Sequence, residues 1–246
     1  MKFIRKTLKP QNKEDEELYV ALKTILGFRP KNINYYKTAF IHRSIKVLDG
    51  NGSPINYERM EFLGDAMLGS IIAAFLFKMV PEGNEGYLTQ MRSKIVSRNQ
   101  LNSLGKDLGL IKYVKSTISK SRMGENIHGN IFEALVGAIY LDRGYRYCEK
   151  FIEKRVINAF VDIPSLENKI TSYKGIIIEY CQKTKKSLEF QTYEDSGNEN
   201  TRHYSVKLVI DGKIVSKGRS TSKKKAEEIA SKRIYFVYQD KIKNIL

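Results

Sequence analysis

The apolar residues of this 246-residue chain follow two different periods, and the period changes near residue 165. From 16 to 160 they recur mostly at the three- and four-residue spacing of a helix. The segments that show this spacing are 16–26, 34–44, 57–79, 86–97, 98–108, 128–142 and 145–160. Pro30, Pro54 and Pro81 fall between them, where helix breakers belong. This part is therefore predicted to be all-α, after a polar N-terminal arm at 1–15.

After Pro164 the pattern mixes helices with strands. HYSVKLVI at 203–210 alternates between apolar and polar residues, which indicates a strand with one buried face. Asp211-Gly212 follows it and is a strong signal for a hairpin turn. The predicted elements are a helix at 171–186, strands at 188–195, 203–210 and 213–220, and a helix at 222–240. The expected domains are an all-α domain at 16–160, a linker at 161–170 and a small α+β (α-β-β-β-α) domain at 171–241.

The chain is strongly basic. Lys and Arg number 43 against 27 Asp and Glu, which gives a net charge of +16. The excess is present on both sides of residue 165, so it is not a single basic tail. Such a charge favours polyanionic partners, nucleic acid first and an anionic membrane second. The alternative is a protein that is basic for solubility alone.

Other features concern the compartment. Cys148 and Cys181 form no metal-ligand pattern and imply no disulfide framework. The first 20 residues lack the apolar core of a secretory signal. The longest apolar run, at 70–77, is too short to span a bilayer. We therefore expect a reduced, soluble, cytoplasmic protein that does not bind membranes.

NYERMEFLGDAML, residues 56–68, places three carboxylates in an otherwise apolar helical segment. Glu58, Glu61 and Asp65 are spaced three and then four residues apart, so they share one helix face. Like charges at this spacing repel by a few tenths of a kcal/mol per pair, and a bound cation would offset that repulsion. Acidic residues near a helix N-terminus also favour the helix dipole. This segment alone therefore leaves both a metal site and an ordinary charged face open.

A second apolar helical segment, 128–145, carries Asn130 and Glu133 three residues apart. Small residues at Ala134, Gly137 and Ala138 would let another helix approach closely. If the two segments pack together, up to five oxygen-bearing side chains converge. Mg²⁺ prefers oxygen ligands of this kind, and one or two such ions beside a basic surface suit phosphodiester hydrolysis.

The segment at 56–68 resembles the signature of the ribonuclease III family, whose usual centre is ERLEFLGDA; only Met60 differs from the usual Leu. Further blocks in the family order are AFIHRS (39–44), EGYLTQMRSKIVSR (85–98) and NIFEALVGAIYLDRGY (130–145). The resemblance covers nearly the whole chain from about residue 16. It implies an all-α endonuclease domain that forms a homodimer, with one active site per subunit and each site cutting one strand of double-stranded RNA.

The resemblance also implies roles for single residues. The metal-binding carboxylates of the family map onto Glu61, Asp65 and Glu133, and Asp65 and Glu133 are expected to be catalytic. Asn130 stands where the family normally has Asp and is expected to offer a carbonyl oxygen to the metal. Glu58 matches a carboxylate with an accessory catalytic role.

The same resemblance suggests a dimer contact and a reaction. Phe62 matches an aromatic residue that inserts into the partner subunit; the alternative is an ordinary core Phe. Tyr87 stands where many members have an acidic residue. The implied cofactor is Mg²⁺, with Mn²⁺ able to substitute and no small-molecule cofactor. Metal-bound water would attack phosphorus in line, giving 5′-phosphate and 3′-hydroxyl ends in ribosomal RNA precursors and messenger RNAs.

Lys223, Lys224 and Lys225 stand in the first turn of the last predicted helix. The helix dipole disfavours cations there by roughly 0.3–1 kcal/mol each. Their presence suggests that an anion binds at this helix start, with help from backbone N–H groups. Charge runs are also commonly solvated faces, so the domain context decides between the two readings.

The α-β-β-β-α order with lysines at this place resembles the double-stranded RNA-binding domain, which reads A-form shape and phosphates. Lys223 and Lys224 match its phosphate-binding lysines, with Lys225 beside them, and Glu179 and Gln182 match polar positions that face a minor groove. The departures from the usual pattern are Ile178, Asn198, Asn200 and Ser220.

Together these features predict a Mg²⁺-dependent homodimeric endonuclease specific for double-stranded RNA. Two alternatives remain. The chain could be a double-stranded RNA-binding protein with weakened or lost cleavage, which Asn130 favours, or a structural, ribosome-associated homologue. Retention of Glu61, Asp65 and Glu133 argues against both.

Overall fold

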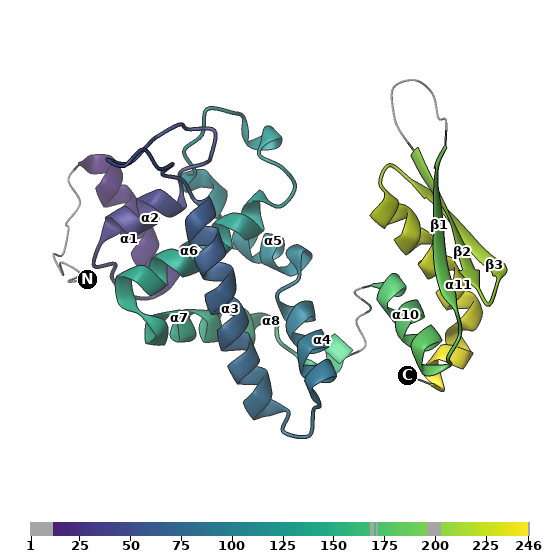
Figure 1. The fold of residues 1–246 in the computed structure, drawn as a ribbon. Coiled ribbons are helices and arrows are strands. Elements are labelled where there is room, and N and C mark those ends of the chain that lie inside the picture. Colours follow the sequence, from purple (N-terminus) through teal and green to yellow (C-terminus); the bar gives the residue numbers. More distant parts are fainter. Residues whose placement is uncertain (1–11, 168–169, 171, 196–202, 246) are drawn as a thin grey trace. The chain divides into compact units, whose positions relative to one another are not determined.

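The computed structural model of the protein describes residues 12–167, 170, 172–195 and 203–245. The chain divides into two compact units, unit 1 at 1–169 and unit 2 at 170–246 (Figure 1). Most of the expected N-terminal arm, at 1–11, lies outside the described residues, as do Asn198 and Asn200.

Unit 1 is helical, as predicted. Its elements are α1 (Lys13–Leu26), α2 (Ile33–Ala39), α3 (Glu58–Met79), α4 (Glu85–Ile95), α5 (Arg98–Asp107), the 3₁₀ turns η1 (Leu110–Tyr113) and η2 (Lys120–Arg122), α6 (Ile127–Arg143), α7 (Tyr145–Ile152), the π-helical turn η3 (Glu153–Ile157), α8 (Asn158–Phe160) and α9 (Ile163–Glu167). The segment predicted as one helix at 145–160 therefore holds α7, a π-helical turn and α8.

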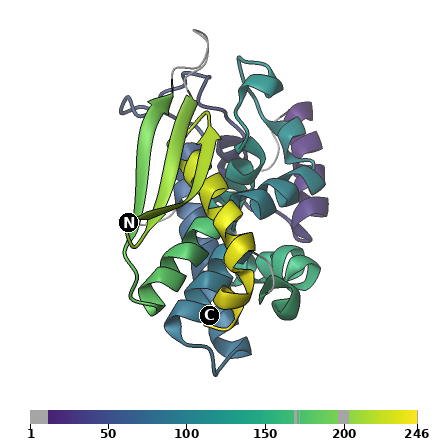
Figure 2. The same cartoon turned by 90° about the vertical axis from the view of Figure 1, so that its right-hand side faces the viewer.

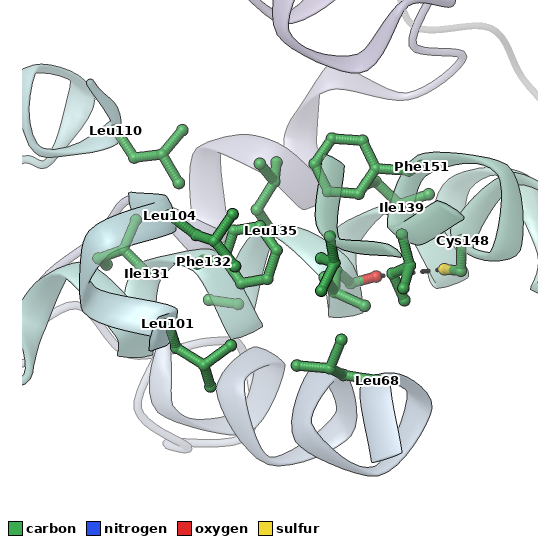
Figure 3. Close-up of a cluster of buried hydrophobic side chains, with 14 of the residues drawn as sticks. Leu68, Leu101, Leu104, Leu110, Ile131, Phe132, Leu135, Ile139, Cys148 and Phe151 are labelled. Carbon is green, nitrogen blue, oxygen red and sulfur yellow. Dashed lines mark hydrogen bonds between the residues drawn. The ribbon is translucent and has the colours of Figure 1, made fainter. Parts of the chain in front are cut away.

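Helix α6 forms the centre of unit 1. Its residues from Ile131 to Ile139 are all buried, and α3, α5, α2 and α7 pack around it. Figure 3 shows this core, where Leu68 of α3, Leu101 of α5 and Phe151 of α7 surround the α6 side chains. An all-round apolar helix is stable only in such a position, which explains why α6 lies inside.

In unit 1, the start of α1 and the end of α2 lie well away from the predicted positions. Helix α1 begins at Lys13, inside the expected arm, because the Asn12 side chain accepts a hydrogen bond from the Asp15 N–H at 2.9 Å. Helix α2 ends at Ala39, so the predicted helix over 40–44 is wrong. There the Lys115 N–H donates to the Phe40 carbonyl and the His42 N–H donates to the Lys115 carbonyl. This pairing with a distant segment replaces further helical turns.

A short helix, α9, lies inside the segment expected to be a linker. The buried Lys94 of α4 donates through Nζ to the carbonyls of Leu166 and Glu167, at 2.8 and 3.0 Å. The Tyr87 hydroxyl donates to the Glu167 carboxylate. Burial lowers the pKa of Lys94. These contacts tie the C-terminal end of unit 1 to α4.

Helix α3 is long and strongly apolar. It is the one helix among the described residues that is long and apolar enough to cross a membrane, by length and composition alone. Core helices of soluble proteins pass the same test. One side of α3 packs on α6, through residues such as Leu68 and Ile72, while Phe62, Phe77 and Met79 are exposed.

Unit 2 has the predicted α-β-β-β-α order. Its elements are α10 (Tyr173–Lys183), β1 (Leu188–Asp195), β2 (His203–Ile210), β3 (Lys213–Ser220) and α11 (Lys223–Lys243). The strands form an antiparallel sheet in the order β1-β2-β3, shown side by side in Figure 2. Asp211 and Gly212 both have positive φ, 49° and 75°, as a two-residue hairpin turn requires. Helix α10 ends three residues before its predicted end, and α11 ends three residues after its own predicted end.

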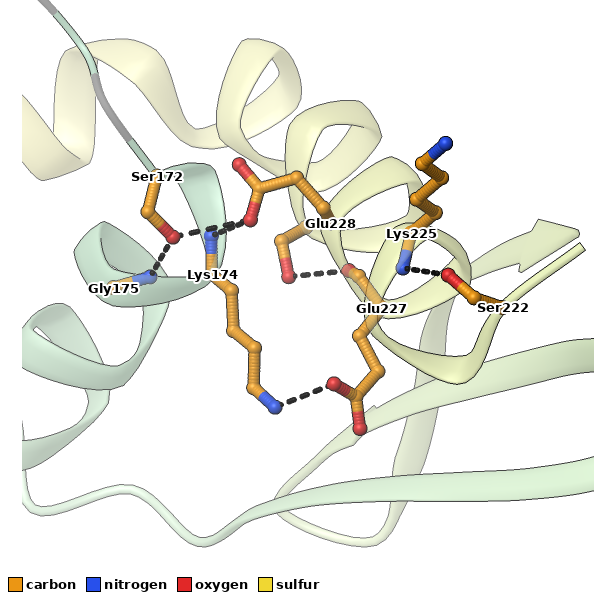
Figure 4. A network of polar contacts seen from close by, with 8 residues as sticks. Ser172, Lys174, Gly175, Ser222, Lys225, Glu227 and Glu228 are labelled. Carbon is orange, nitrogen blue, oxygen red and sulfur yellow. Dashed lines mark hydrogen bonds and ion pairs between the residues drawn. The ribbon is translucent and has the colours of Figure 1, made fainter. Parts of the chain in front are cut away.

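The two helices of unit 2 are joined by a polar network (Figure 4). Glu228 of α11 accepts hydrogen bonds from the backbone N–H groups of Tyr173 and Lys174 and from the Ser172 hydroxyl. Lys174 also pairs with Glu227 at 2.6 Å. A carboxylate at the N-terminus of α10 satisfies free N–H groups and favours the helix dipole. Glu228 therefore holds the start of α10 against α11.

Candidate active site and RNA-binding surface

One pocket of unit 1 brings together carboxylates from two helices. Its lining residues are Glu58, Glu61, Phe62, Asp65, Val96, Arg98 and Glu133. The four acidic side chains predicted for the site thus converge, three from α3 and Glu133 from α6. Asn130 lies beside the pocket, one helical turn before Glu133, and is not part of its lining.

Close contact between α3 and α6 positions these carboxylates. A Cβ atom at Gly64 would lie 1.7 Å from the Glu133 carbonyl oxygen, and one at Gly137 would lie 2.3 Å from the Met60 carbonyl oxygen. The two helices can therefore cross at this distance only with glycine at both positions. This confirms the expected close approach of a second helix, and it sets Glu133 opposite Glu61 and Asp65.

The pocket raises the pKa of two of its carboxyl groups, Glu133 and Glu61. The Glu133 side chain is only 5% exposed. Burial, with the nearby negative charges of Asp65 and Glu61, raises the pKa of Glu133 to about 7, although Arg98 acts in the opposite direction. Burial also raises the pKa of Glu61, with Glu58 and Asp65 adding to the effect. Carboxylates crowded in this way are poised to take up a cation.

The donor set is the one that a hard divalent cation prefers, namely carboxylate oxygens and one amide oxygen. The side chains line one pocket without closing on one point. In the described part of the chain, no group of three or more His, Cys, Asp or Glu side chains lies at the spacing of a metal site. The residues fit such an ion by their chemistry, although their oxygen atoms are not gathered at one point.

Arg98 was not singled out from the sequence, although it lines the pocket. Its Nη1 donates to Asn130 Oδ1 at 2.9 Å and lies 3.8 Å from Glu133 Oε2. The available signal was a cation at the first position of a helix after Ser97, where the dipole disfavours it.

Glu58 is held at the rim of the pocket. Its backbone N–H donates to Asn56 Oδ1 at 2.9 Å, and its carboxylate accepts from Asn56 Nδ2 at 3.3 Å and from Arg43 at 3.4 Å. Its side chain remains about half exposed. Glu58 is therefore oriented by neighbours yet open to solvent.

Phe62 is 81% exposed at the mouth of the same pocket. The alternative of an ordinary core Phe is therefore wrong for the single chain. Because α3 packs on α6 with its other side, the Phe62 ring projects away from the core of its own unit.

The basic residues of unit 2 lie at the start of α11, as predicted. Lys223, Lys224 and Lys225 are exposed, and the Ser222 hydroxyl caps the helix by accepting from the Lys225 N–H at 3.3 Å. Lys223 Nζ lies 5.7 Å from the centre of the Tyr204 ring. The three ammonium groups are thus available to an anionic partner.

The two polar residues predicted for RNA contact lie on α10. Gln182 is exposed, while Glu179 is half-buried and pairs with Lys183 at 3.5 Å, one turn further along the helix. All five predicted RNA-binding residues therefore belong to unit 2 and stand on its two helices.

Comparisons with known families agree with this division. The Ribonuclease-III-like family matches residues 32–160, and the Double-stranded RNA binding motif matches residues 173–235. A helical unit with an acidic pocket, followed by an α-β-β-β-α unit with a basic helix start, defines a class of proteins that bind and cleave double-stranded RNA.

Individual relatives make the assignment specific. Ribonuclease 3 from Zunongwangia profunda is 58% identical over 242 residues, which cover 98% of this chain and 100% of the relative. Ribonuclease 3 from Flavobacterium psychrophilum is 58% identical over 243 residues, covering 98% and 99%. The nuclease domain of ribonuclease III from Campylobacter jejuni covers 58% of this chain and 97% of its own, with 25% identity and a TM-score of 0.51. The chain belongs to the ribonuclease III family and is a double-stranded RNA endoribonuclease.

Proposed function

We propose that the pocket between α3 and α6 is the catalytic site of a Mg²⁺-dependent endonuclease that leaves 5′-phosphate and 3′-hydroxyl ends. The observation that carries the proposal is the convergence of Glu58, Glu61, Asp65 and Glu133 on one pocket. The raised pKa of Glu133 accompanies this convergence. A site that gathers negative charge in a partly buried pocket needs a cation before it can receive a phosphate.

Glu61, Asp65, Glu133 and the Asn130 oxygen would hold the metal, with Mn²⁺ as a substitute that binds mixed ligands more strongly. When bound, such an ion activates water and stabilises negative charge on the reacting oxygens. Asp65 and Glu133 are the proposed catalytic carboxylates. Glu58, oriented by Asn56 at the pocket rim, has the accessory role of positioning solvent or the RNA backbone.

We propose that the active form is a homodimer built on the exposed side of α3. Phe62, Phe77 and Met79 are exposed by 81%, 73% and 60%, and each would be buried in a partner. A solved structure of the Campylobacter jejuni nuclease domain is described as showing structural flexibility in a region involved in dimer formation. Phe62 adjoins the pocket, so dimer formation would also complete the wall of each site.

Unit 2 would hold the duplex through Lys223, Lys224 and Lys225, with Glu179 and Gln182 near a minor groove. Exposed lysines at a helix start suit phosphate contacts, and the fold reads A-form geometry. The proposed substrates are ribosomal RNA precursors and structured messenger RNAs in the cytoplasm.

A second candidate function has one observation in its favour. Asn130 supplies no negative charge, and its oxygen accepts a hydrogen bond from Arg98. A protein that grips duplex RNA but cuts it weakly, or a structural ribosome-associated homologue, would tolerate this arrangement.

A cleavage assay distinguishes these functions. The purified protein is incubated with a perfect RNA duplex and with single-stranded RNA of the same sequence, with Mg²⁺, with Mn²⁺ and with chelator. We expect duplex cutting only with metal and little cutting of the single strand. Binding without cleavage under every metal condition would support the second candidate instead.

The proposed dimer is tested by light scattering on the parent and on Phe62→Ala. The parent should show twice the 28.3 kDa chain mass at micromolar concentration, and Phe62→Ala should shift the equilibrium toward the monomer. A parent that is monomeric and still makes double-strand cuts would overturn this part of the proposal.

A further inference from the structure

Arg98 is an exposed cation directed into an acidic pocket. Its side chain is 59% exposed, against 5% for the Glu133 side chain that it faces. It stands at the first position of α5, where no acidic residue accompanies it in the first turn. The helix dipole disfavours a cation at this end. Arg98 therefore places positive charge in the pocket and lowers the stability of α5 slightly.

The contacts of Arg98 hold it loosely. Its hydrogen bond goes to the neutral amide of Asn130 at 2.9 Å, and its ion pair with Glu133 is long, at 3.8 Å. Both contacts use Nη1. A carboxylate at position 130 could instead form a two-pronged pair with the guanidinium, which is much stronger. The guanidinium can therefore leave Asn130 at the cost of one hydrogen bond to a neutral group.

We propose that Arg98 is a catalytic residue that leaves Asn130 when the duplex enters and donates hydrogen bonds to a non-bridging oxygen of the scissile phosphate. This inference rests on the proposed function of the pocket. In the reaction, the oxygen of a water molecule forms a bond to phosphorus and loses a proton to solvent, the bond between phosphorus and the 3′ oxygen breaks, and the 3′ oxygen takes up a proton. The guanidinium keeps its proton throughout and stabilises the charge that develops on the phosphate.

Two other roles for Arg98 make different predictions. A guanidinium that only competes with the metal would, when removed, tighten metal binding and speed cleavage at low Mg²⁺. A guanidinium that only holds Asn130 and Glu133 in place would, when removed, weaken metal binding and cleavage together. If Arg98 contacts the phosphate, its removal separates the two measurements: metal binding stays the same or becomes tighter, while cleavage becomes slower.

The test uses the full chain as parent, Arg98→Ala, Arg98→Lys and the control Lys106→Ala. Lys106 is an exposed cation at the other end of α5 and does not line the pocket. Mn²⁺ binding without RNA is followed by electron paramagnetic resonance, duplex binding is followed in chelator, and cleavage is followed in single turnovers at saturating Mg²⁺.

We expect Arg98→Ala to bind Mn²⁺ at least as tightly as the parent and duplex no more tightly than the parent, and to cut roughly 10- to 100-fold more slowly, the range for a lost charge-assisted hydrogen bond. Arg98→Lys should recover part of the rate. Replacing one non-bridging oxygen of the scissile phosphate by sulfur should shrink the difference between parent and Arg98→Ala for one of the two diastereomers. Lys106→Ala should match the parent.

Two results would overturn the role of Arg98 while leaving the pocket assignment intact. The first is that Arg98→Ala cleaves as fast as the parent at saturating Mg²⁺. The second is that Arg98→Ala loses Mn²⁺ binding and cleavage together. A parent that never cuts with any metal would instead overturn the proposed function, and this inference with it.

Discussion

The two units use charge in opposite ways. In unit 1 the important charges are acidic and line one pocket, in which Glu133 is buried, Glu61 is partly buried and Asp65 is exposed. In unit 2 they are basic and exposed, at Lys223, Lys224 and Lys225. Bond cleavage requires charge in a partly dehydrated place where it acts strongly, whereas duplex binding requires charge that reaches phosphates in solvent. We therefore propose that cleavage is local to unit 1 and duplex binding to unit 2.

Both units are nevertheless built on the same packing device, a glycine at the closest approach of two elements. In unit 1, Gly64 of α3 lies against the Glu133 carbonyl of α6. In unit 2, a Cβ atom at Gly218 of β3 would lie 2.1 Å from the Ala226 carbonyl oxygen of α11. The two glycines therefore allow each unit to be disrupted separately.

The largest expected effect is the loss of one unit at a time. Gly64→Ala should lower the free energy of unfolding of unit 1 by about 3 kcal/mol or more, because the backbone there cannot move aside cheaply. Gly218→Ala should do the same to unit 2. Hydrogen exchange read by mass spectrometry should show the loss of protection confined to the mutated unit. Equal loss of protection in both units would contradict their independence.

A smaller effect is expected on duplex binding. Lys223→Ala combined with Lys224→Ala should weaken binding to a duplex and reduce the salt dependence by up to about two counterions, because two phosphate contacts are lost. Fluorescence anisotropy over a range of KCl concentrations measures both quantities, and the unaltered chain is the reference. Tight binding by the double variant in moderate salt would show that the phosphate contacts lie elsewhere.

Asn130→Asp should affect unit 1 alone, because it adds one negative charge beside the acidic pocket. The site should then hold Mg²⁺ more tightly, and the Mg²⁺ concentration for half-maximal duplex cleavage should fall. Duplex binding in chelator should be nearly unchanged. A parent that is inactive with Mg²⁺ and Mn²⁺, alongside active Asn130→Asp, would show that Asn130 abolishes cleavage in this chain.

A pH dependence of stability is also expected, in unit 1 alone. The pKa of Glu133 is about 7 in the fold, against an ordinary value of 4.5, because burial and neighbouring carboxylates disfavour its charged form. The folded state therefore holds this proton more strongly, and unit 1 should lose stability as pH rises from about 4.5 to about 7. Thermal unfolding in chelator measures this slope, and Glu133→Gln should make it shallower. An identical slope in both proteins would assign it to other groups.

Local patterns predicted some elements well. The bounds of β2 and β3 follow from the alternation at 203–210 and from the Asp211-Gly212 turn, and both signals are contained in a short stretch. The close packing of α3 and α6 followed from the small residue at Gly137. Features of this kind depend on neighbours in sequence or on residue size alone.

Other features depend on partners far along the chain. Helix α2 ends early because its end pairs with Lys115, and α9 is held by Lys94, 72 residues from Leu166. Arg98 reaches Asn130 across 32 residues. No local pattern encodes these contacts, so the sequence did not single out Arg98 even though the carboxylates around it were predicted.

The most direct test of the division between the units is Glu133→Gln, measured for cleavage and for duplex binding in parallel. The change removes one negative charge from the pocket and keeps the shape of the side chain. We predict no detectable cleavage with Mg²⁺, and duplex binding in chelator close to that of the parent. Cleavage at the parent rate would remove Glu133 from the site, and loss of duplex binding would show that catalysis and RNA binding are not separate functions of the two units.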